Sequence, residues 1–213
     1  MSETVITEAL RYLGYRGSPP DEQTAALLEK GYKELSAAAQ PRFVYKLLKK
    51  EECGQFLYGA DIEKHLSASD GVIFFAATLG SGTDKVIRTA EISNMAYALI
   101  LDALASAMTE EFCDRSEAQI KSKVQGHFTW RFSPGYGDYP ISVQPLIIDL
   151  LRADKLIGLT VTDSSILLPR KSVTAVIGVS DGDQPQNSKR GCDSCLMREK
   201  CAFRKEGKIC DNS

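Results

Sequence analysis

The sequence of 213 residues contains no long apolar run, and no stretch approaches the roughly 20 apolar residues that cross a bilayer. The first ten residues, MSETVITEAL, lack the basic and apolar regions of a signal peptide. The 26 basic and 28 acidic residues nearly balance, and a net charge of −2 gives no sign of electrostatic binding to nucleic acid. Together these absences predict a cytoplasmic protein with no membrane or nucleic-acid partner.

The composition is that of a globular protein, with 43% hydrophobic and 25% charged residues. Helix and strand signals are mixed, and their order does not alternate regularly. We therefore predict an α+β fold, a single mixed α/β domain over residues 1–180. The polar segment DGDQPQNSKRG predicts a linker over 181–191, which leaves a cysteine-rich tail over 192–213.

Hydrophobic periodicity predicts the main helices and strands of this domain. The predicted helices cover 3–13, 21–39 with Asp21 as N-cap, an interrupted region from about 84 to 118, and a short helix within 141–154. The predicted strands cover 42–48, 71–80, 126–132 and a β-hairpin over 164–180 with its turn at Pro169, Arg170 and Lys171.

The segment GSGTDK, residues 80–85, places two glycines between a predicted strand and a predicted helix. This arrangement is typical of a phosphate-binding turn, but the third glycine and the lysine–threonine pair of such turns are missing. We favour the alternative, a tight strand-to-helix turn in which Thr83 or Asp84 caps the helix.

The segment RFSPGYGDYP, residues 131–140, has two glycines, two prolines and two tyrosines and is predicted to be irregular. Its arginine suits bidentate pairing with a carboxylate, its glycines permit close approach to the backbone, and its tyrosines offer stacking faces. These features suit an amino-acid-linked nucleoside such as S-adenosylmethionine, but residue types alone do not establish such a site. The structural alternative is a surface salt bridge followed by a proline-stiffened loop.

Four of the six cysteines crowd into the last 22 residues with the spacing C-x2-C-x5-C-x8-C. They are Cys192, Cys195, Cys201 and Cys210. Because cytosolic disulfides are uncommon, such a cluster more often binds a metal. Four thiolates suit a [4Fe–4S] cluster or a tetrahedral zinc ion, and the single C-x2-C knuckle favours the cluster. Zinc, or no metal, remains open.

Residues 127 to 179 resemble the S-adenosylmethionine-binding activation domain of vitamin B12-dependent methionine synthase. That family carries an arginine, a small residue and Pro-Gly-Tyr, then a helix, a Leu-Thr segment and a Pro-x-x-Ser-Val turn. The matching residues are Arg131, Ser133, Pro134, Gly135, Tyr136, Pro140, Leu159, Thr160, Ser164 or Ser165, Pro169, Ser172 and Val173.

The resemblance implies a role for four residues in binding S-adenosylmethionine. Arg131 is expected to bind the methionyl carboxylate, and backbone at Ser133 and Gly135 to contact the adenosyl portion, with Tyr136 helping to hold the ligand. The implied function is reductive reactivation of cobalamin, in which cob(II)alamin receives one electron and a methyl group. Cob(I)alamin is a strong nucleophile, so proximity and alignment suffice and no catalytic residue is expected.

The sequence departs from the family in two ways. The family also uses an acidic residue from an Asp-Trp segment that is missing here, which leaves Asp70, Glu91 and Asp102 as candidates for the ligand amino group. The chain also has no room for a cobalamin domain, so the corrinoid is expected on a separate methyltransferase, with a flavodoxin- or ferredoxin-type electron donor. The alternatives are an iron–sulfur activator of another corrinoid protein without methyl donation, and a binding module with a structural metal.

Overall fold

The computed structural model describes residues 2–15 and 18–182. The four tail cysteines lie outside the described residues. In chain order the elements are α1 (Glu3–Tyr12), α2 (Glu22–Ala38), β1 (Arg42–Lys49), η1 (Lys50–Glu52), η2 (Gly54–Phe56), α3 (Ala60–His65), β2 (Gly71–Thr78), α4 (Ser81–Ser93), α5 (Met95–Lys121), β3 (His127–Phe128), η3 (Ile141–Val143), α6 (Gln144–Leu151), α7 (Ala153–Leu156), β4 (Thr160–Val161), β5 (Leu167–Leu168) and β6 (Ser172–Ser180).

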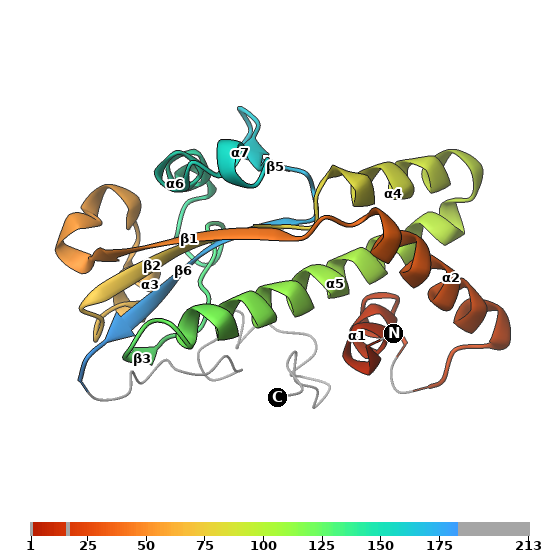
Figure 1. The fold of residues 1–213 in the computed structure, drawn as a ribbon, viewed down its shortest axis with the longest axis horizontal. Helices are drawn as coiled ribbons and strands as arrows, with labels where there is room; N and C mark the ends of the chain where they lie inside the picture. Colours follow the sequence, from red (N-terminus) through yellow and green to blue (C-terminus); the bar gives the residue numbers. More distant parts are fainter. Residues whose placement is uncertain (1, 16–17, 183–213) are drawn as a thin grey trace. The chain divides into compact units, whose positions relative to one another are not determined.

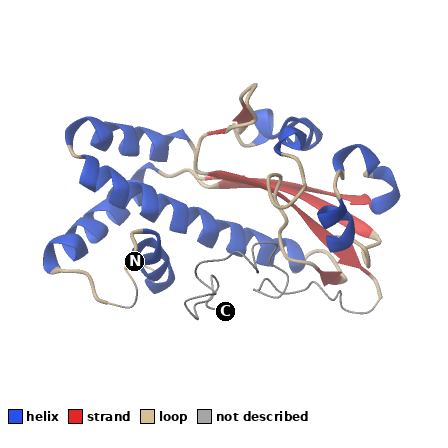
Figure 2. Ribbon diagram, turned by 180° about the vertical axis from the view of Figure 1, so that it is seen from behind, coloured by secondary structure: helices blue, strands red, loops and turns tan. Residues whose placement is uncertain are grey.

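Four strands form one sheet in the order β1-β2-β6-β3 (Figure 1). β4 pairs with β5 in a separate two-stranded sheet. Figure 2 draws the strands in red and the helices in blue. The larger sheet is antiparallel throughout. β3 and β6 pair in that sense, and hydrogen bonds at the strand ends show it for the other two pairs. These bonds run from Gln40 to Leu79, from Lys50 to Asp70, from Leu79 to Lys171 and from Asp70 to Val179. An antiparallel sheet with separate helices is typical of the α+β class, so the predicted fold class is confirmed.

The described chain divides into two compact units, each assembled from separate stretches of sequence. The first takes residues up to 44, 76–122 and 148–173, and the second takes 45–75, 123–147 and residues from 174 onward. Four of the five boundaries fall within β1, β2, α6 and β6, so these elements contribute to both units, and the fifth follows the end of α5. The predicted limits of the domain, linker and tail stay predictions.

The first unit is built on a helical core around α5, against which α1, α2 and α4 pack (Figure 1). Gly31 of α2 permits a close approach, because a Cβ there would lie 3.0 Å from the side chains of Leu101 and Leu104. Asp21 caps α2 by accepting a 2.7 Å hydrogen bond from the Thr24 amide, as predicted. None of the described helices is both long and apolar enough to cross a membrane.

The predicted interruption of the long helical region lies at Asn94, between α4 and α5. Its backbone is extended, with φ −156° and ψ 93°, which ends α4. Its side chain then accepts a 3.0 Å hydrogen bond from the Tyr97 amide and so caps α5. One residue therefore stops one helix and starts the next.

The GSGTDK segment forms the predicted tight turn between β2 and α4, but the cap of the helix differs from the predicted one. The N-cap is Gly80, with φ 84° and no side-chain cap, so the prediction of a Thr83 or Asp84 cap is wrong. The Thr83 hydroxyl donates to the Gly80 carbonyl instead, and Asp84 accepts from the Arg170 amide. At Gly82 a Cβ would collide with the Ala38 carbonyl oxygen. The turn conformation and this close contact account for both glycines without a phosphate.

The predicted hairpin over 164–180 is also wrong. β5 pairs with β4 in the register Thr160↔Leu168 and Val161↔Leu167, whereas β6 lies in the larger sheet beside β2. The hairpin turn therefore falls earlier, where the Ser165 amide donates to the Thr162 carbonyl. The Pro169 segment connects two sheets instead of closing a hairpin.

Candidate functional site

The strand that leads into RFSPGYGDYP contains a β-bulge. The paired residues are His127 with Ser180, Phe128 with Val179 and, as an isolated bridge, Phe132 with Val176. Between Phe128 and Phe132 the register shifts by one residue, so Trp130 and Arg131 together oppose Ile177. A bulge interrupts the strict alternation of side chains and often lies beside a functional site. The continuous strand predicted over 126–132 is therefore broken next to the arginine of the motif.

Residues 133–139 form a compact turn that backbone hydrogen bonds hold closed. The Tyr136 amide donates to the Ser133 carbonyl at 3.1 Å, and the Gly135 amide donates to the Tyr139 carbonyl at 2.8 Å. Gly135 has φ 95° and Gly137 has φ 55°, a region that glycine enters without the steric cost of a side chain. The two glycines are thus required by the path of the backbone.

Aromatic rings gather on one side of this turn. The rings of Trp130 and Phe132 lie 5.2 Å apart between centroids, and the Tyr136 ring lies 6.4 Å from the first and 5.9 Å from the second. His65 completes the cluster at 4.7 Å from Trp130 and 4.9 Å from Phe132. Tyr136 is 47% exposed, so one ring of the cluster is accessible at the surface.

The short helix α3 contacts the turn at its N-terminal end. The carboxylate of Asp138 accepts hydrogen bonds from the amides of Ala60 (2.7 Å) and Asp61 (3.0 Å). The Asp61 carboxylate in turn accepts from the Asp138 amide at 3.1 Å. Gly59 has φ 115°, and a Cβ there would collide with the Asp138 carboxylate. A carboxylate at a helix N-terminus satisfies amides that have no partner within the helix.

The other end of α3 contacts the residue before Arg131. The imidazole Nε2 of His65 donates to the Trp130 carbonyl at 2.9 Å, since a carbonyl only accepts. Burial lowers the pKa of His65 from 6.5 to about 4, so the ring is neutral at pH 7. Nearby, the buried Tyr139 hydroxyl donates to the Phe56 carbonyl at 3.0 Å, and burial raises the pKa of Tyr139. His65 is therefore a buried, neutral residue that joins α3 to the residue before Arg131.

The four residues predicted to bind the ligand belong to one continuous segment of the second unit. Arg131 is buried, with 4% of its surface exposed, and Ser133 is half-buried. Gly135 and Tyr136 are exposed at the tip of the turn. A guanidinium, a glycine without a side chain at an exposed turn and an accessible ring suit the carboxylate and the flat base of an adenosyl amino acid. Their roles in binding stay predictions.

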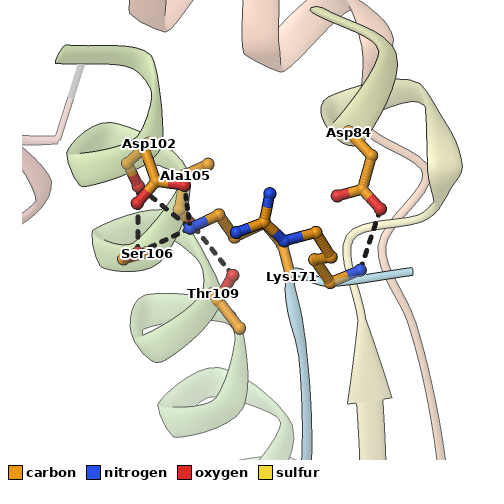
Figure 3. Close-up of polar contacts among 7 residues, drawn as sticks. Asp84, Asp102, Ala105, Ser106, Thr109 and Lys171 are labelled. Carbon is orange, nitrogen blue, oxygen red and sulfur yellow. Dashed lines mark hydrogen bonds and ion pairs between the residues drawn. The ribbon is translucent and has the colours of Figure 1, made fainter. Parts of the chain in front are cut away.

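The three candidates for the ligand amino group have other positions. Asp70 accepts a hydrogen bond from the Asp181 amide, and Glu91 is exposed near the end of α4. Asp102 pairs with Lys171, whose nitrogen lies 2.8 Å from its carboxylate (Figure 3). Glu91 and Asp102 belong to the first unit.

Two acidic residues of the second unit meet at this turn, Asp138 within it and Asp61 in α3, and neither was among the predicted candidates. Asp138 lies within the RFSPGYGDYP motif itself, so an acidic residue at this position could have been named as a candidate from the sequence. Asp61 gave no local signal, because its contact with Asp138 joins residues 77 positions apart.

No group of three or more histidine, cysteine or acidic side chains that suits a metal occurs within residues 2–15 and 18–182. Cys53 and Cys113 are buried, and burial raises the pKa of the Cys53 thiol to about 11. A thiol of this kind is a poor nucleophile and metal ligand at neutral pH. The metal prediction therefore depends on the tail alone.

Comparisons with known proteins support the fold. Neither a family model nor a curated protein matches the sequence. A solved structure does match, the MetH reactivation domain bound to AdoHcy, with a TM-score of 0.52 and 18% sequence identity. The match covers 97% of this chain and 75% of that one. The chain therefore has the fold of the MetH reactivation domain.

Proposed function

We propose that this chain binds S-adenosylmethionine at residues 131–136 and supports reductive reactivation of a cobalamin-dependent methyltransferase carried on a separate protein. One observation carries the proposal. The Arg131–Tyr136 motif, chosen from its residue types, lies beside a β-bulge in a fold shared with a reactivation domain that was solved with AdoHcy.

In this proposal the bound ligand supplies an electrophilic methyl group, and the chain supplies position. Arg131 pairs with the methionyl carboxylate, and its burial strengthens that pairing by excluding water. Exposed backbone at Gly135 lets the adenosyl portion approach, and the Tyr136 ring covers it. Holding the methyl group in line with an incoming nucleophile is the whole catalytic contribution, so no general base is needed.

The tail adds a second, separable part of the proposal. Cys192, Cys195, Cys201 and Cys210 would ligate a [4Fe–4S] cluster that passes the electron from a flavodoxin- or ferredoxin-type donor to cobalamin. Zinc in the same position would act as a structural staple. The spacing of the four cysteines in the sequence supports the cluster.

Calorimetric titration of the purified chain with S-adenosylmethionine and with AdoHcy tests the binding site. Losing a charged pair costs about 2–5 kcal/mol, so Arg131→Ala should weaken affinity by more than about tenfold. Arg170→Ala removes an exposed arginine of the first unit and serves as the matched control. Equal affinity in wild type and Arg131→Ala would exclude this placement.

Turnover separates reactivation from its alternative. With a low-potential reductant and a cobalamin protein in the cob(II) state, the visible spectrum should change to that of methylcobalamin only when S-adenosylmethionine is present. A reduction that proceeds equally well without it would favour the redox activator, and no change of the corrinoid in either case would favour the binding module.

A further inference from the structure

We propose that α3 is a two-point brace that fixes the shape of the ligand turn, which makes His65 and Asp138 positioning residues. The ligand part of this inference rests on the proposed function. The brace itself is a property of the backbone and is measurable without any ligand.

The first point of the brace joins the start of α3 to the far end of the motif. Two amides of α3 donate to Asp138, and Asp61 returns a hydrogen bond to the Asp138 amide. These three bonds form a closed, reciprocal set. Only a residue without a side chain suits position 59, where a Cβ would occupy the place of the Asp138 carboxylate. The fit of Gly59 to Asp138 indicates a specific contact.

The second point joins the end of α3 to the near end of the motif. His65 donates to the carbonyl of Trp130, the peptide group that leads directly into Arg131. The same imidazole packs against the rings on both sides of Arg131, at 4.7 Å from Trp130 and 4.9 Å from Phe132. The bulge interrupts the regular pairing at this position, and His65 adds a contact from outside the sheet to the residue before Arg131.

Both ends of residues 131–138 are therefore held by one helix of six residues. Between the two points lie Gly135 and Gly137, the residues whose backbones lose most freedom on becoming ordered. Without the brace, ligand binding would have to order this segment, at about 1 kcal/mol or more per residue. With the brace that cost is met in folding, which is the general advantage of a preorganised site.

Calorimetry on two substitutions and a matched control tests the effect on the ligand. Asp138→Ala removes the acceptor of both α3 amides and should weaken S-adenosylmethionine binding about five- to twentyfold. Asp138→Asn keeps one carbonyl acceptor and should recover part of that loss. Asp21→Ala removes an equivalent helix cap from α2, so it should lower the melting temperature similarly and leave affinity unchanged.

The second point is tested by His65→Leu and His65→Gln. Leucine removes the donor to the Trp130 carbonyl and should weaken affinity by about fivefold or more, whereas glutamine keeps an N–H donor and should restore part of the affinity. A purely structural role would lower stability in both variants without this difference in affinity.

Amide hydrogen exchange of the unliganded chain supplies the readout that is independent of the proposed function. The Gly135 and Tyr136 amides should exchange more than about tenfold faster in Asp138→Ala, while the Tyr97 amide at the start of α5 should be unchanged. Faster exchange in Asp138→Ala, together with a wild-type chain that does not bind S-adenosylmethionine, would keep the brace and reject the proposed function. Weaker binding with unchanged exchange would overturn the brace, because Asp138 would then act on the ligand directly. Unchanged affinity and unchanged exchange would overturn it as well.

Discussion

The ammonium nitrogen of Lys171 lies 2.8 Å from a carboxylate oxygen of Asp102, although the two residues are 69 positions apart. The same nitrogen donates to the Ser106 hydroxyl at 2.9 Å and to the Asp102 carbonyl at 3.2 Å (Figure 3). The Lys171 side chain is only 12% exposed. An ammonium that is this enclosed and makes several hydrogen bonds joins the residue before β6 to the N-terminal half of α5 within the first unit.

Lys171→Met should therefore lower the free energy of unfolding by about 1–3 kcal/mol, because charged hydrogen bonds are lost and their acceptors stay partly buried. Lys33→Met is the control, since Lys33 and Glu29 are 73% and 58% exposed and such surface pairs contribute about 0–1 kcal/mol. Urea denaturation measures both. Equal losses in the two variants would show that the Lys171 contacts add nothing beyond a surface pair.

Gly82→Ala should destabilise the chain, even though alanine is favoured over glycine in a helix by up to about 1 kcal/mol. The new Cβ would collide with the Ala38 carbonyl oxygen, and such overpacking costs about 1–3 kcal/mol or more. Gly54→Ala is the control, because nothing lies within 4 Å of the Cβ position there. Thermal unfolding should separate the two variants. If Gly82→Ala is as stable as wild type, the close contact with Ala38 does not account for Gly82, and the phosphate-binding explanation gains support.

The buried neutral His65 should make stability depend on pH. Its pKa is lowered from 6.5 to about 4 in the folded chain, so between these values the unfolded chain binds a proton that the folded chain does not. Stability therefore falls as the pH falls through this window, by about 3 kcal/mol for this residue. The loss between pH 7 and pH 4 should be smaller by about that amount in His65→Gln.

His127→Gln supplies the matched control for this titration, because His127 is exposed in β3. It removes an imidazole that lies outside the contact with Trp130, so the effect of His65→Gln is measured against it. If the unfolding free energy of His65→Gln depends on pH as strongly as that of wild type, His65 is solvated in solution and its contact with Trp130 is not maintained.

The spacing of the four tail cysteines in the sequence predicts a bound [4Fe–4S] cluster. Anaerobically purified protein should be brown and carry about four irons per chain, and Cys195→Ser should bleach or destabilise the cluster. Cys53→Ala, which changes a cysteine outside the tail, should keep the iron. Metal analysis that finds zinc in place of iron would remove the redox part of the proposed function and leave S-adenosylmethionine binding untouched.

Local signals in the sequence predicted much of the fold. The Asp21 cap and the break between α4 and α5 depend on residues close in sequence, and both are confirmed. The predicted hairpin over 164–180 was wrong because Pro169 indicates a turn but does not specify the sheet that each flanking strand joins. That choice depends on the pairing of Leu168 with Thr160, which local residue types do not encode.

The candidate site depends even more on contacts between residues that are distant in sequence. Residue types located the Arg131 motif, but the bulge beside it arises from pairing with β6, more than 40 positions later. The partners of the turn in α3 lie 65 to 78 positions earlier. Asp61 and His65 were therefore not recognisable as parts of the site until the chain was folded.

Because of the α3 contacts, the motif should not keep its conformation when it is transferred alone to another protein. A fragment that begins after α5 would contain all of RFSPGYGDYP and the segments that resemble the activation domain, yet none of the α3 residues that contact the two ends of the turn. Grafted onto another scaffold, the ten residues should behave as a flexible loop unless Gly59, Asp61 and His65 are grafted with them. A recognition pattern for this site should therefore be written as two separated parts, one in α3 and one in the turn, and not as a single short string.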